Sequence, residues 1–263
     1  MASPIVTLTA DWGVGDFFAG MVKGRLMRSI ADVRIVDISL GIEPYDIRQA
    51  LFVVANSYRQ FPQGTIHIID VNSHENASRK HIVMLCNGHY FIANDNGILG
   101  ALAAGGDAQV VDINTGTDER GSSNFAAFDY YCDAAALLAR GMPVAELGAP
   151  HGSLLVCMLP NPLFTGNELS ASIIHIDSYG NAYLNITLGQ FEAFRAGRRF
   201  RARIKDSIIE KIQPTFSAEG TRGISLMVSN TGYLMLSMFQ RGAGSLFGLN
   251  TGDPVRFQFL ETI

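Results

Sequence analysis

The sequence predicts an α/β protein of two domains, in which a mostly parallel sheet with helices on both faces precedes a C-terminal antiparallel β-barrel-like domain. In the first half, strand-like and helix-like segments alternate, which is typical of a parallel sheet with crossover helices. In the second half, short strand-like runs and turns replace this rhythm. A stretch rich in Pro, Gly and Asn lies between the two halves. We therefore expect an N-terminal α/β domain at 1–160, a linker at 161–170 and a C-terminal β domain at 171–263.

The N-terminal elements are predicted from hydrophobic periodicity. Apolar residues recur at helical spacing over 16–31 and over 46–61, where a Pro-Gln-Gly sequence ends the second helix. The run 66–71 is almost continuously apolar, as in a strand that is covered on both faces. Asn87-Gly88 is a strong hairpin signal. Strands are expected at 5–10, 33–39, 66–71, 81–85, 89–93 and 108–113, and further helices near Leu99 and over 134–140.

The C-terminal half is predicted to consist of short strands joined by turns. In the basic segment 198–205, Phe200, Ala202 and Ile204 alternate with cationic residues. This alternation favours a half-buried strand with a solvated basic face over a phosphate or nucleic-acid patch. Strands are expected at 171–177, 181–187, 199–205, 224–229, 233–239 and 254–260.

Composition limits the classes of function. The chain has 263 residues, a net charge of −4 and a pI of about 5.8, whereas a duplex-binding domain normally carries a basic footprint, so nucleic acid is not an expected partner. The sequence contains no run of 18 apolar residues, so no membrane span is expected. Three widely spaced cysteines without a CxxC pair fit a reducing, cytoplasmic location. The histidines lack metal-ligand spacing and the common cofactor motifs are missing, so neither a metal nor a cofactor is expected.

Polar residues follow the predicted parallel strands. Asp11 and Asp16 come after the first strand, Asp37 lies on the second, and Asn72 and Arg79 follow the third. Ligands of open α/β sheets bind beyond the carboxyl ends of the strands, so Asp11, Asn72 and Arg79 are candidates to face one crevice. The alternative is that these residues are helix caps and turn residues, as Asp and Asn often are.

Several motifs, in order along nearly the whole chain, resemble one family. They are TLTADWGVGDFFAGMVKG, IVDIS, PYDIRQALFVVANSYRQFPQGTIHI, YFIANDNGILG, IDSYGNAYLNI and GLNTGDPVRF. Together they resemble the S-adenosylmethionine (SAM) hydroxide adenosyltransferases, a family that includes fluorinases and chlorinases. The resemblance implies SAM or adenosine as the ligand, no cofactor, and a homotrimer with each ligand held between the N-terminal domain of one subunit and the C-terminal domain of the next.

The resemblance also implies roles for individual residues. Asp11 falls where the family binds the ribose diol, and Asp16 matches an acidic residue near the methionine amine. Asp177 and Asn181 match residues that hold the methionine and adenosyl parts. Where the family has an aromatic residue before Gly232, this chain has Thr231, so Tyr233 is a candidate for adenine stacking.

The catalytic set of the hydrolytic members is altered. Their Asp–Arg–His set aligns with Asn72, Arg79 and Ala126 in this chain. Asn72 can orient a water molecule but cannot take its proton, and Arg79 cannot act as a base. In the rewritten loop, His74 or Glu75 would supply a base, unless both are solvated loop side chains.

Three functions remain open from the sequence. The first is cleavage of SAM to adenosine and L-methionine by attack of water or hydroxide at C5′, with Arg79, Asn72 and His74 as catalytic candidates. The alternative is a non-catalytic SAM- or adenosine-binding module, with a ligand-free trimeric scaffold as its limiting case. The least favoured is a halide-dependent 5′-halo-5′-deoxyadenosine synthase, because Asn72 with Ala127 does not match the halide-using members.

Overall fold

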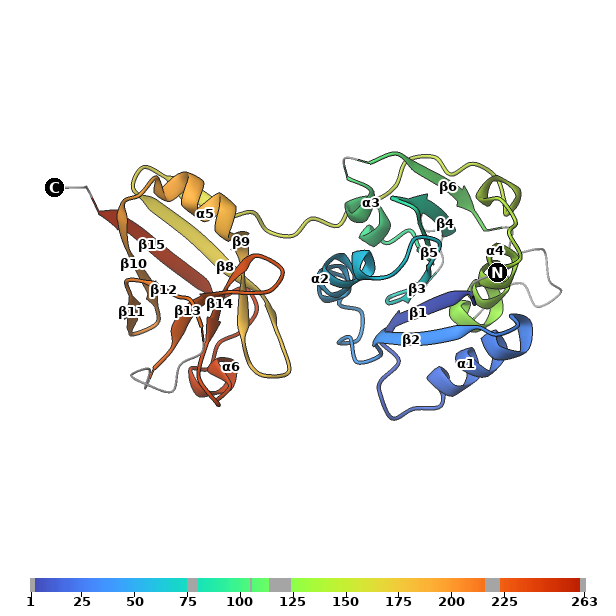
Figure 1. Cartoon of the computed structure of the whole chain (residues 1–263), viewed down its shortest axis with the longest axis horizontal. Helices are drawn as coiled ribbons and strands as arrows, with labels where there is room; N and C mark the ends of the chain where they lie inside the picture. Colours follow the sequence, from blue (N-terminus) through green and yellow to red (C-terminus); the bar gives the residue numbers. More distant parts are fainter. Residues whose placement is uncertain (1–2, 75–79, 105, 114–123, 216–222, 261–263) are drawn as a thin grey trace. The chain divides into compact units, whose positions relative to one another are not determined.

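The computed structural model describes residues 3–74, 80–104, 106–113, 124–215 and 223–260. The chain divides into two compact units, Met1–Met158 and Leu159–Ile263, and each is considered by itself. Figure 1 shows a layered α/β arrangement in the N-terminal unit and a curled sheet in the C-terminal unit. The fold class predicted from the sequence is confirmed.

The N-terminal unit is built on a mostly parallel sheet with the strand order β2-β1-β3-β5-β4-β6. β2, β1, β3 and β5 are parallel, whereas β4 is antiparallel to both of its neighbours. The predicted hairpin joins β4 to β5, and Asn87 and Gly88 take positive φ angles of 52° and 78°, as a tight two-residue turn requires. The strands are β1 (Ile5–Ala10), β2 (Arg34–Ser39), β3 (Ile66–Asp70), β4 (His81–Cys86), β5 (His89–Asn94) and β6 (Ala108–Asp112).

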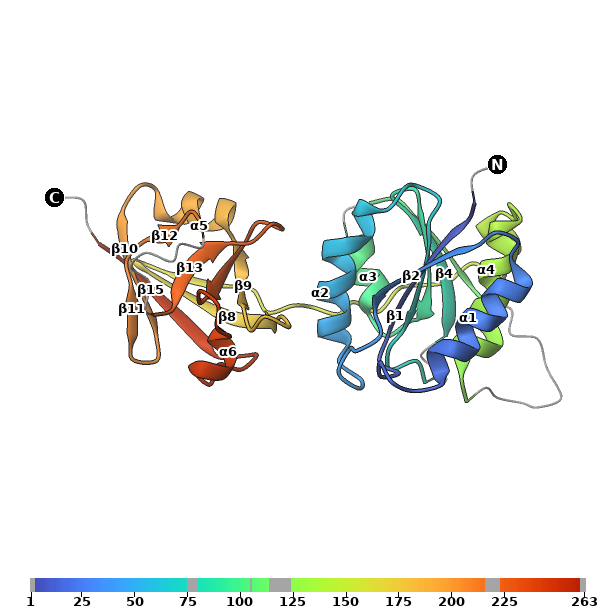
Figure 2. The same ribbon diagram turned by 60° about the horizontal axis from the view of Figure 1, so that its bottom comes forward.

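Helices cover both faces of this sheet, as Figure 2 shows. On one face, α1 (Phe18–Ser29) contacts α4 (Cys132–Ala139) and the π-helical turn η2 (Ala127–Tyr131). On the other face, α2 (Ile47–Ser57) contacts α3 (Ile98–Ala103). Short 3-10 turns η1 (Tyr58–Gln60) and η3 (Val144–Glu146) complete the unit. Both faces of the central strands are therefore shielded from solvent, which explains the uninterrupted apolar run of β3.

The C-terminal unit is a curled, almost entirely antiparallel sheet with the order β11-β10-β15-β8-β9-β14-β13-β12 and with β7 beside β8. Only the short β12–β13 pair is parallel in the described part of this unit. Phe191 of helix α5 is fully buried against the concave apolar side. The elements are β7 (Leu163–Thr165), β8 (Glu168–Ile176), β9 (Ala182–Thr187), α5 (Leu188–Arg195), β10 (Arg199–Ile204), β11 (Ser207–Ile209), β12 (Ile212–Gln213), β13 (Ser225–Val228), β14 (Tyr233–Ser237), α6 (Ala243–Leu246) and β15 (Pro254–Leu260).

The segment 161–170, expected to be a linker, contains regular structure. β7 lies within it and pairs with the first residues of β8 through a tight turn at Gly166, whose φ is 55°. A glycine at this position allows the left-handed backbone that closes the hairpin. The Pro, Gly and Asn residues of the segment therefore reflect a turn as well as a connection.

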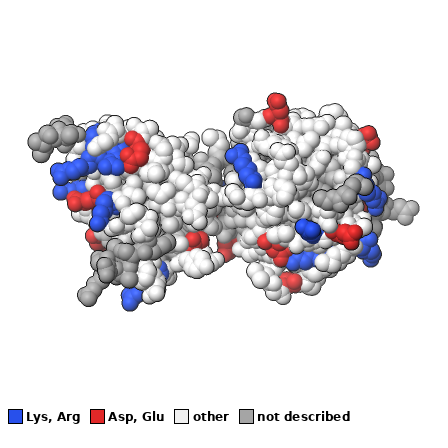
Figure 3. Space-filling model, in the orientation of Figure 1, with Lys and Arg blue, Asp and Glu red and all other residues white. Residues whose placement is uncertain are grey.

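The basic segment folds as predicted. Along β10, exposed Arg199, Arg201 and Arg203 alternate with buried apolar residues. Arg201 forms an ion pair with Glu210 at 2.7 Å, and Figure 3 shows acidic groups interspersed with basic ones at this end of the unit. This is a solvated strand face of mixed charge. Separately, none of the helices in the described ranges is long and apolar enough to cross a membrane.

Candidate active site

A cavity of about 450 Å³ lies in the N-terminal unit at the carboxyl ends of β1 and β3. It brings together three residues singled out in the sequence, Asp11, Asn72 and His74, although they come from different strands and a loop. The lining consists of Asp11, Trp12, Phe18, Tyr45, Asp70, Asn72, Ser73, His74, Asn124, Phe125 and Ala126. The position agrees with the rule that open α/β sheets bind ligands beyond the carboxyl ends of their strands.

Asp11 is held by two backbone amides. Its Oδ2 accepts hydrogen bonds from the Tyr45 amide at 2.8 Å and from the Asn72 amide at 3.3 Å. Both donors belong to residues in the left-handed region, with φ of 68° at Tyr45 and 51° at Asn72. Such backbone is costly for a bulky residue, and it recurs where a site must aim a group precisely enough to bind. No hydrogen bond from the described residues reaches Oδ1, which leaves that oxygen for a ligand hydroxyl.

Asp70 is a buried carboxylate in the same cavity that was not among the residues predicted from the sequence. It is the last residue of β3 and is only 6% exposed. Trp12 donates its indole N–H to Asp70 Oδ2 at 2.6 Å. The signal in the sequence is an acidic residue that ends an otherwise apolar, fully covered strand.

Burial raises the pKa of Asp70 to about 6; the Ser73 and Trp12 side chains and the nearby His74 counteract this rise, and Asp11 adds to it. Asp70 Oδ1 and the Ser73 hydroxyl are both buried; Ser73 lies near enough to Asp70 to lower its pKa, but neither atom makes a hydrogen bond of good geometry within the described residues. Two unsatisfied polar atoms in one cavity lining mark a place for a water molecule or a polar ligand atom.

The remaining N-terminal candidates lie elsewhere or outside the described residues. Asp16 is exposed, accepts from the Phe17 amide at 2.7 Å and does not line the cavity. Asp37 forms an ion pair with Lys23 at 2.6 Å and does not line the cavity. Glu75 and Arg79 lie outside the described residues.

Ala126 and Ala127, the two alanines singled out in the sequence, have different surroundings. Ala126, which the motif resemblance aligns with a histidine, lines the cavity and is 7% exposed. Ala127 is fully buried in the core of the N-terminal unit and does not line the cavity. An imidazole is therefore absent at that position, and the carboxylates dominate the chemistry of the described lining.

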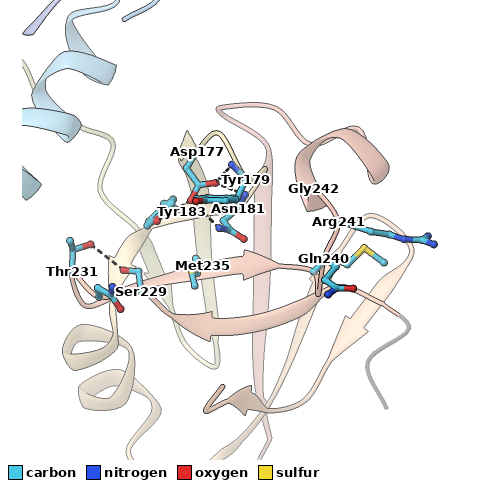
Figure 4. Close-up of a pocket in the computed structure, with 12 residues that line it drawn as sticks. Asp177, Tyr179, Asn181, Tyr183, Ser229, Thr231, Met235, Gln240, Arg241 and Gly242 are labelled. Carbon is cyan, nitrogen blue, oxygen red and sulfur yellow. Dashed lines mark hydrogen bonds between the residues drawn. The ribbon is translucent and has the colours of Figure 1, made fainter. Parts of the chain in front are cut away.

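A second cavity, of about 680 Å³, lies in the C-terminal unit and includes Asp177 and Asn181. In Figure 4 these two residues gather with Tyr179 and Tyr183 at one side of the cavity, whereas Gln240, Arg241 and Gly242 lie at another. The full lining is Asp177, Tyr179, Asn181, Tyr183, Ser229, Asn230, Thr231, Met235, Met238, Gln240, Arg241 and Gly242.

Asp177 organises this second cavity. Its Oδ1 accepts from the amides of Tyr179 and Asn181 at 2.9 Å, and its Oδ2 accepts from Asn181 Nδ2 at 2.9 Å and from the Tyr183 hydroxyl at 3.2 Å. The side-chain amide oxygen of Asn181 (Oδ1) accepts from the Ser237 hydroxyl. Burial, with the neighbouring Asp177 charge, raises the pKa of Tyr183, so its hydroxyl stays protonated as a donor.

Tyr233 occupies the start of β14 and is not among the residues that line this cavity. Its amide donates to the Ser229 hydroxyl at 3.1 Å, and that hydroxyl also lies 3.1 Å from the Thr231 hydroxyl. The turn before β14 thus presents small polar groups to the cavity, with Met235 supplying apolar surface.

Comparisons with known proteins cover nearly the whole chain. Residues 6–148 match the SAM hydroxide adenosyltransferase N-terminal domain, and residues 171–256 match the C-terminal domain. An (R)-S-adenosyl-L-methionine hydrolase of Salinispora arenicola is 26% identical, with 97% of this chain and 98% of the relative covered. A fluorinase of Nocardia brasiliensis is 23% identical, with 96% of each covered.

Solved structures share the fold. An uncharacterized conserved protein from Thermotoga maritima superposes with a TM-score of 0.85 at 24% identity, over 97% of this chain and 99% of that one. A conserved hypothetical protein from Thermus thermophilus gives a TM-score of 0.70 at 20% identity, over 98% of this chain and all of the other.

Proposed function

The chain belongs to the SAM hydroxide adenosyltransferase family, and on this premise we propose that it cleaves SAM with water to adenosine and L-methionine. The observation that carries the proposal is the N-terminal cavity, where Asp11, Asn72 and a buried carboxylate meet at the carboxyl ends of the parallel strands. Relatives named as SAM hydrolases that match almost end to end support the same reaction.

Asp11 is proposed to hold the ribose. A carboxylate accepts hydrogen bonds from vicinal hydroxyls, and the two amides on Oδ2 fix its orientation while Oδ1 stays open. Asp16 is proposed to pair with the methionine ammonium in a charge-assisted bond. Its exposure in the described structure supports access for a ligand.

Asp177 and Asn181 are proposed to hold the methionine and adenosyl parts. Their own hydrogen bonds give the second cavity a fixed polar wall, which supports a binding role rather than a catalytic one. Tyr233 is retained as a proposed adenine contact on the resemblance alone.

The chemical step needs an activated oxygen nucleophile. Water has a pKa near 15.7, and general-base help typically contributes about 10²–10⁴ in rate. Asn72 is proposed to orient the water through its side-chain amide, and Arg79 to stabilise developing hydroxide character. His74 lies at the cavity as a candidate base, although its side chain is exposed and stands 6.3 Å from the Tyr45 ring, centroid to centroid.

We propose further that the active assembly is a homotrimer in the cytoplasm, with each SAM bound by the N-terminal unit of one subunit and the C-terminal unit of the next. The motif resemblance supports the trimer. All three cysteines fall within the described residues as free thiols, two of them buried, which supports a reducing compartment. Light scattering on the purified protein measures the assembly directly.

The competing function is a SAM-binding module without catalysis. The observation in its favour is Ala126, which places a methyl group where the hydrolytic members carry a histidine. Halide transfer is disfavoured because Asn72 with Ala127 does not match the halide-using members. In addition, Ala127 is packed in the core and does not line the cavity.

The experiment is incubation of the purified protein with SAM, followed by chromatographic quantification of adenosine and methionine. A no-protein control corrects for spontaneous breakdown, and parallel reactions with chloride or fluoride report any halogenated product. Equimolar adenosine and methionine support hydrolysis. Binding measured by calorimetry without product supports the module and rejects the hydrolase.

A further inference from the structure

We infer that Asp70 is the general base of this protein, taking the proton from a water molecule held between Asp70 Oδ1 and the Ser73 hydroxyl as that water attacks C5′ of SAM. This inference rests on the proposed function and deepens it, because it assigns the proton acceptor that Asn72 and Ala126 cannot provide.

Geometry is the first support. Asp70 and Asn72 line the same cavity, so a carboxylate two residues before Asn72 reaches the space where a nucleophilic water oriented by Asn72 would sit. The chain therefore lacks a carboxylate at Asn72, but Asp70 provides one in the lining of the same cavity.

The unsatisfied atoms are the second support. Trp12 occupies Asp70 Oδ2, which fixes the carboxylate plane, and Oδ1 is left buried without a partner in the described part of the chain. The Ser73 hydroxyl is in the same condition. A water molecule that bridges them satisfies both groups and presents its oxygen to the cavity. His74, which also lines the cavity, is exposed.

The charge state of Asp70 also suits the role. A carboxyl with a pKa of about 6 is mostly ionised at neutral pH, yet it is a stronger base than an ordinary carboxylate. The titratable groups that act on it are Asp11 and His74, and its charge acts in turn on the Cys132 thiol of α4. Burial raises the pKa of Cys132 to about 12, so this thiol stays neutral.

The proposed step balances as follows. The water oxygen forms a bond to C5′, and the C5′–S bond breaks with its electron pair passing to the sulfonium, which leaves as the neutral thioether of methionine. The proton lost by the water goes to Asp70 and then to solvent. The products are adenosine, methionine and one proton, with no oxidant, reductant or metal required.

The test compares Asp70→Asn with wild type. The amide keeps the shape of the side chain and an oxygen to accept from Trp12, but it cannot take a proton. We expect kcat to fall by about 10²–10⁴-fold, with the Kd for SAM measured by calorimetry within a few fold of wild type. Asp32→Asn is the matched control: it is an exposed residue at φ 53°, where Asn is equally at home, and kcat should not change.

A pH profile separates the base from its neighbours. For wild type, kcat/KM should rise through a pH of about 6 and then level off, since the base must be ionised. His74→Ala should keep this step, and the residual activity of Asp70→Asn should lack it. If circular dichroism shows that Asp70→Asn does not fold, the pH profile of His74→Ala is the test instead. A rise of kcat/KM near pH 6 in that variant supports Asp70 as the base, and the loss of this rise overturns the assignment.

Different results would overturn the base assignment and the proposed function. A wild-type protein that turns over SAM while Asp70→Asn retains its kcat and its pH step overturns the base assignment alone. A wild-type protein that binds SAM and forms no adenosine at any pH overturns the proposed function and the base assignment with it.

Discussion

Removing the charge of Asp70 should stabilise the folded protein at high pH, because the carboxyl is ionised there in a buried site. Its pKa rises from 3.8 to about 6 in the folded state, a shift of about two units. Each unit corresponds to about 1.36 kcal/mol. The ionised Asp70 therefore costs up to about 3 kcal/mol of unfolding free energy.

The sign follows from proton binding. Between pH 4 and 6 the folded state binds more protons at Asp70 than the unfolded state does, so the contribution of this group to stability falls as the pH rises through 6. Below pH 4, Asp70 is protonated in both the folded and the unfolded state, and its burial carries no charge penalty. Asp70→Asn carries no such dependence, so its advantage over wild type should grow from near zero at pH 4 to at most about 3 kcal/mol at pH 8.

Urea denaturation at a series of pH values measures this difference. Buried histidines such as His67, whose pKa burial and the neighbouring His89 lower to about 3, also make stability pH-dependent. They contribute equally to wild type and variant, so subtraction isolates Asp70. Asp32→Asn serves again as the exposed control and should follow wild type. Parallel stability curves for Asp70→Asn and wild type from pH 4 to 8 would refute the reasoning, since Asp70 would then titrate as an ordinary carboxyl.

Three further outcomes are expected. Trp12→Phe removes the indole N–H that donates to Asp70 at 2.6 Å. Because a hydrogen bond to a charged group contributes about 1.5–3 kcal/mol, the pH at which kcat/KM rises should increase by about one to two units. An unchanged pH profile would contradict a role for this hydrogen bond. Asp11→Asn should weaken SAM binding by about 10–100-fold in calorimetry, whereas an unchanged Kd rejects its ribose role. Asp177→Ala breaks four hydrogen bonds and should lower the unfolding free energy by about 2–3 kcal/mol in urea denaturation; a smaller loss than in Asp32→Ala would speak against it.

Periodicity predicted the layers of the fold because it reports burial directly. The uninterrupted apolar run of β3 required cover on both faces, and α1 and α2 supply it from opposite sides. The alternation in β10 required one wet face, which the structure has. In the segment 161–170, the Pro, Gly and Asn residues were interpreted as a linker, because the pairing of β7 with β8 depends on the register between the two strands, which a local pattern does not encode.

Strand ends predicted that Asp11, Asn72 and Arg79 would face one crevice, because adjacent parallel strands end at one edge. Asp11 and Asn72 do line one cavity, and Arg79 lies outside the described residues. Asp37, which lies on the edge strand β2, pairs with Lys23 of α1 and was not predicted to join them. Asp70 was not predicted as a site residue, because its role depends on burial and on a hydrogen bond from Trp12, which lies 58 residues away in the sequence. Contacts of that kind arise only when the strands are assembled.

The most direct test of the account is the amount of adenosine and methionine that the purified protein forms from SAM at pH 8, measured by chromatography against a no-protein control. The account predicts equimolar adenosine and methionine that accumulate in proportion to protein concentration. SAM that remains intact in the presence of protein shown by calorimetry to bind it would contradict the account, and the cavity around Asp11 would then be a binding site without hydrolysis.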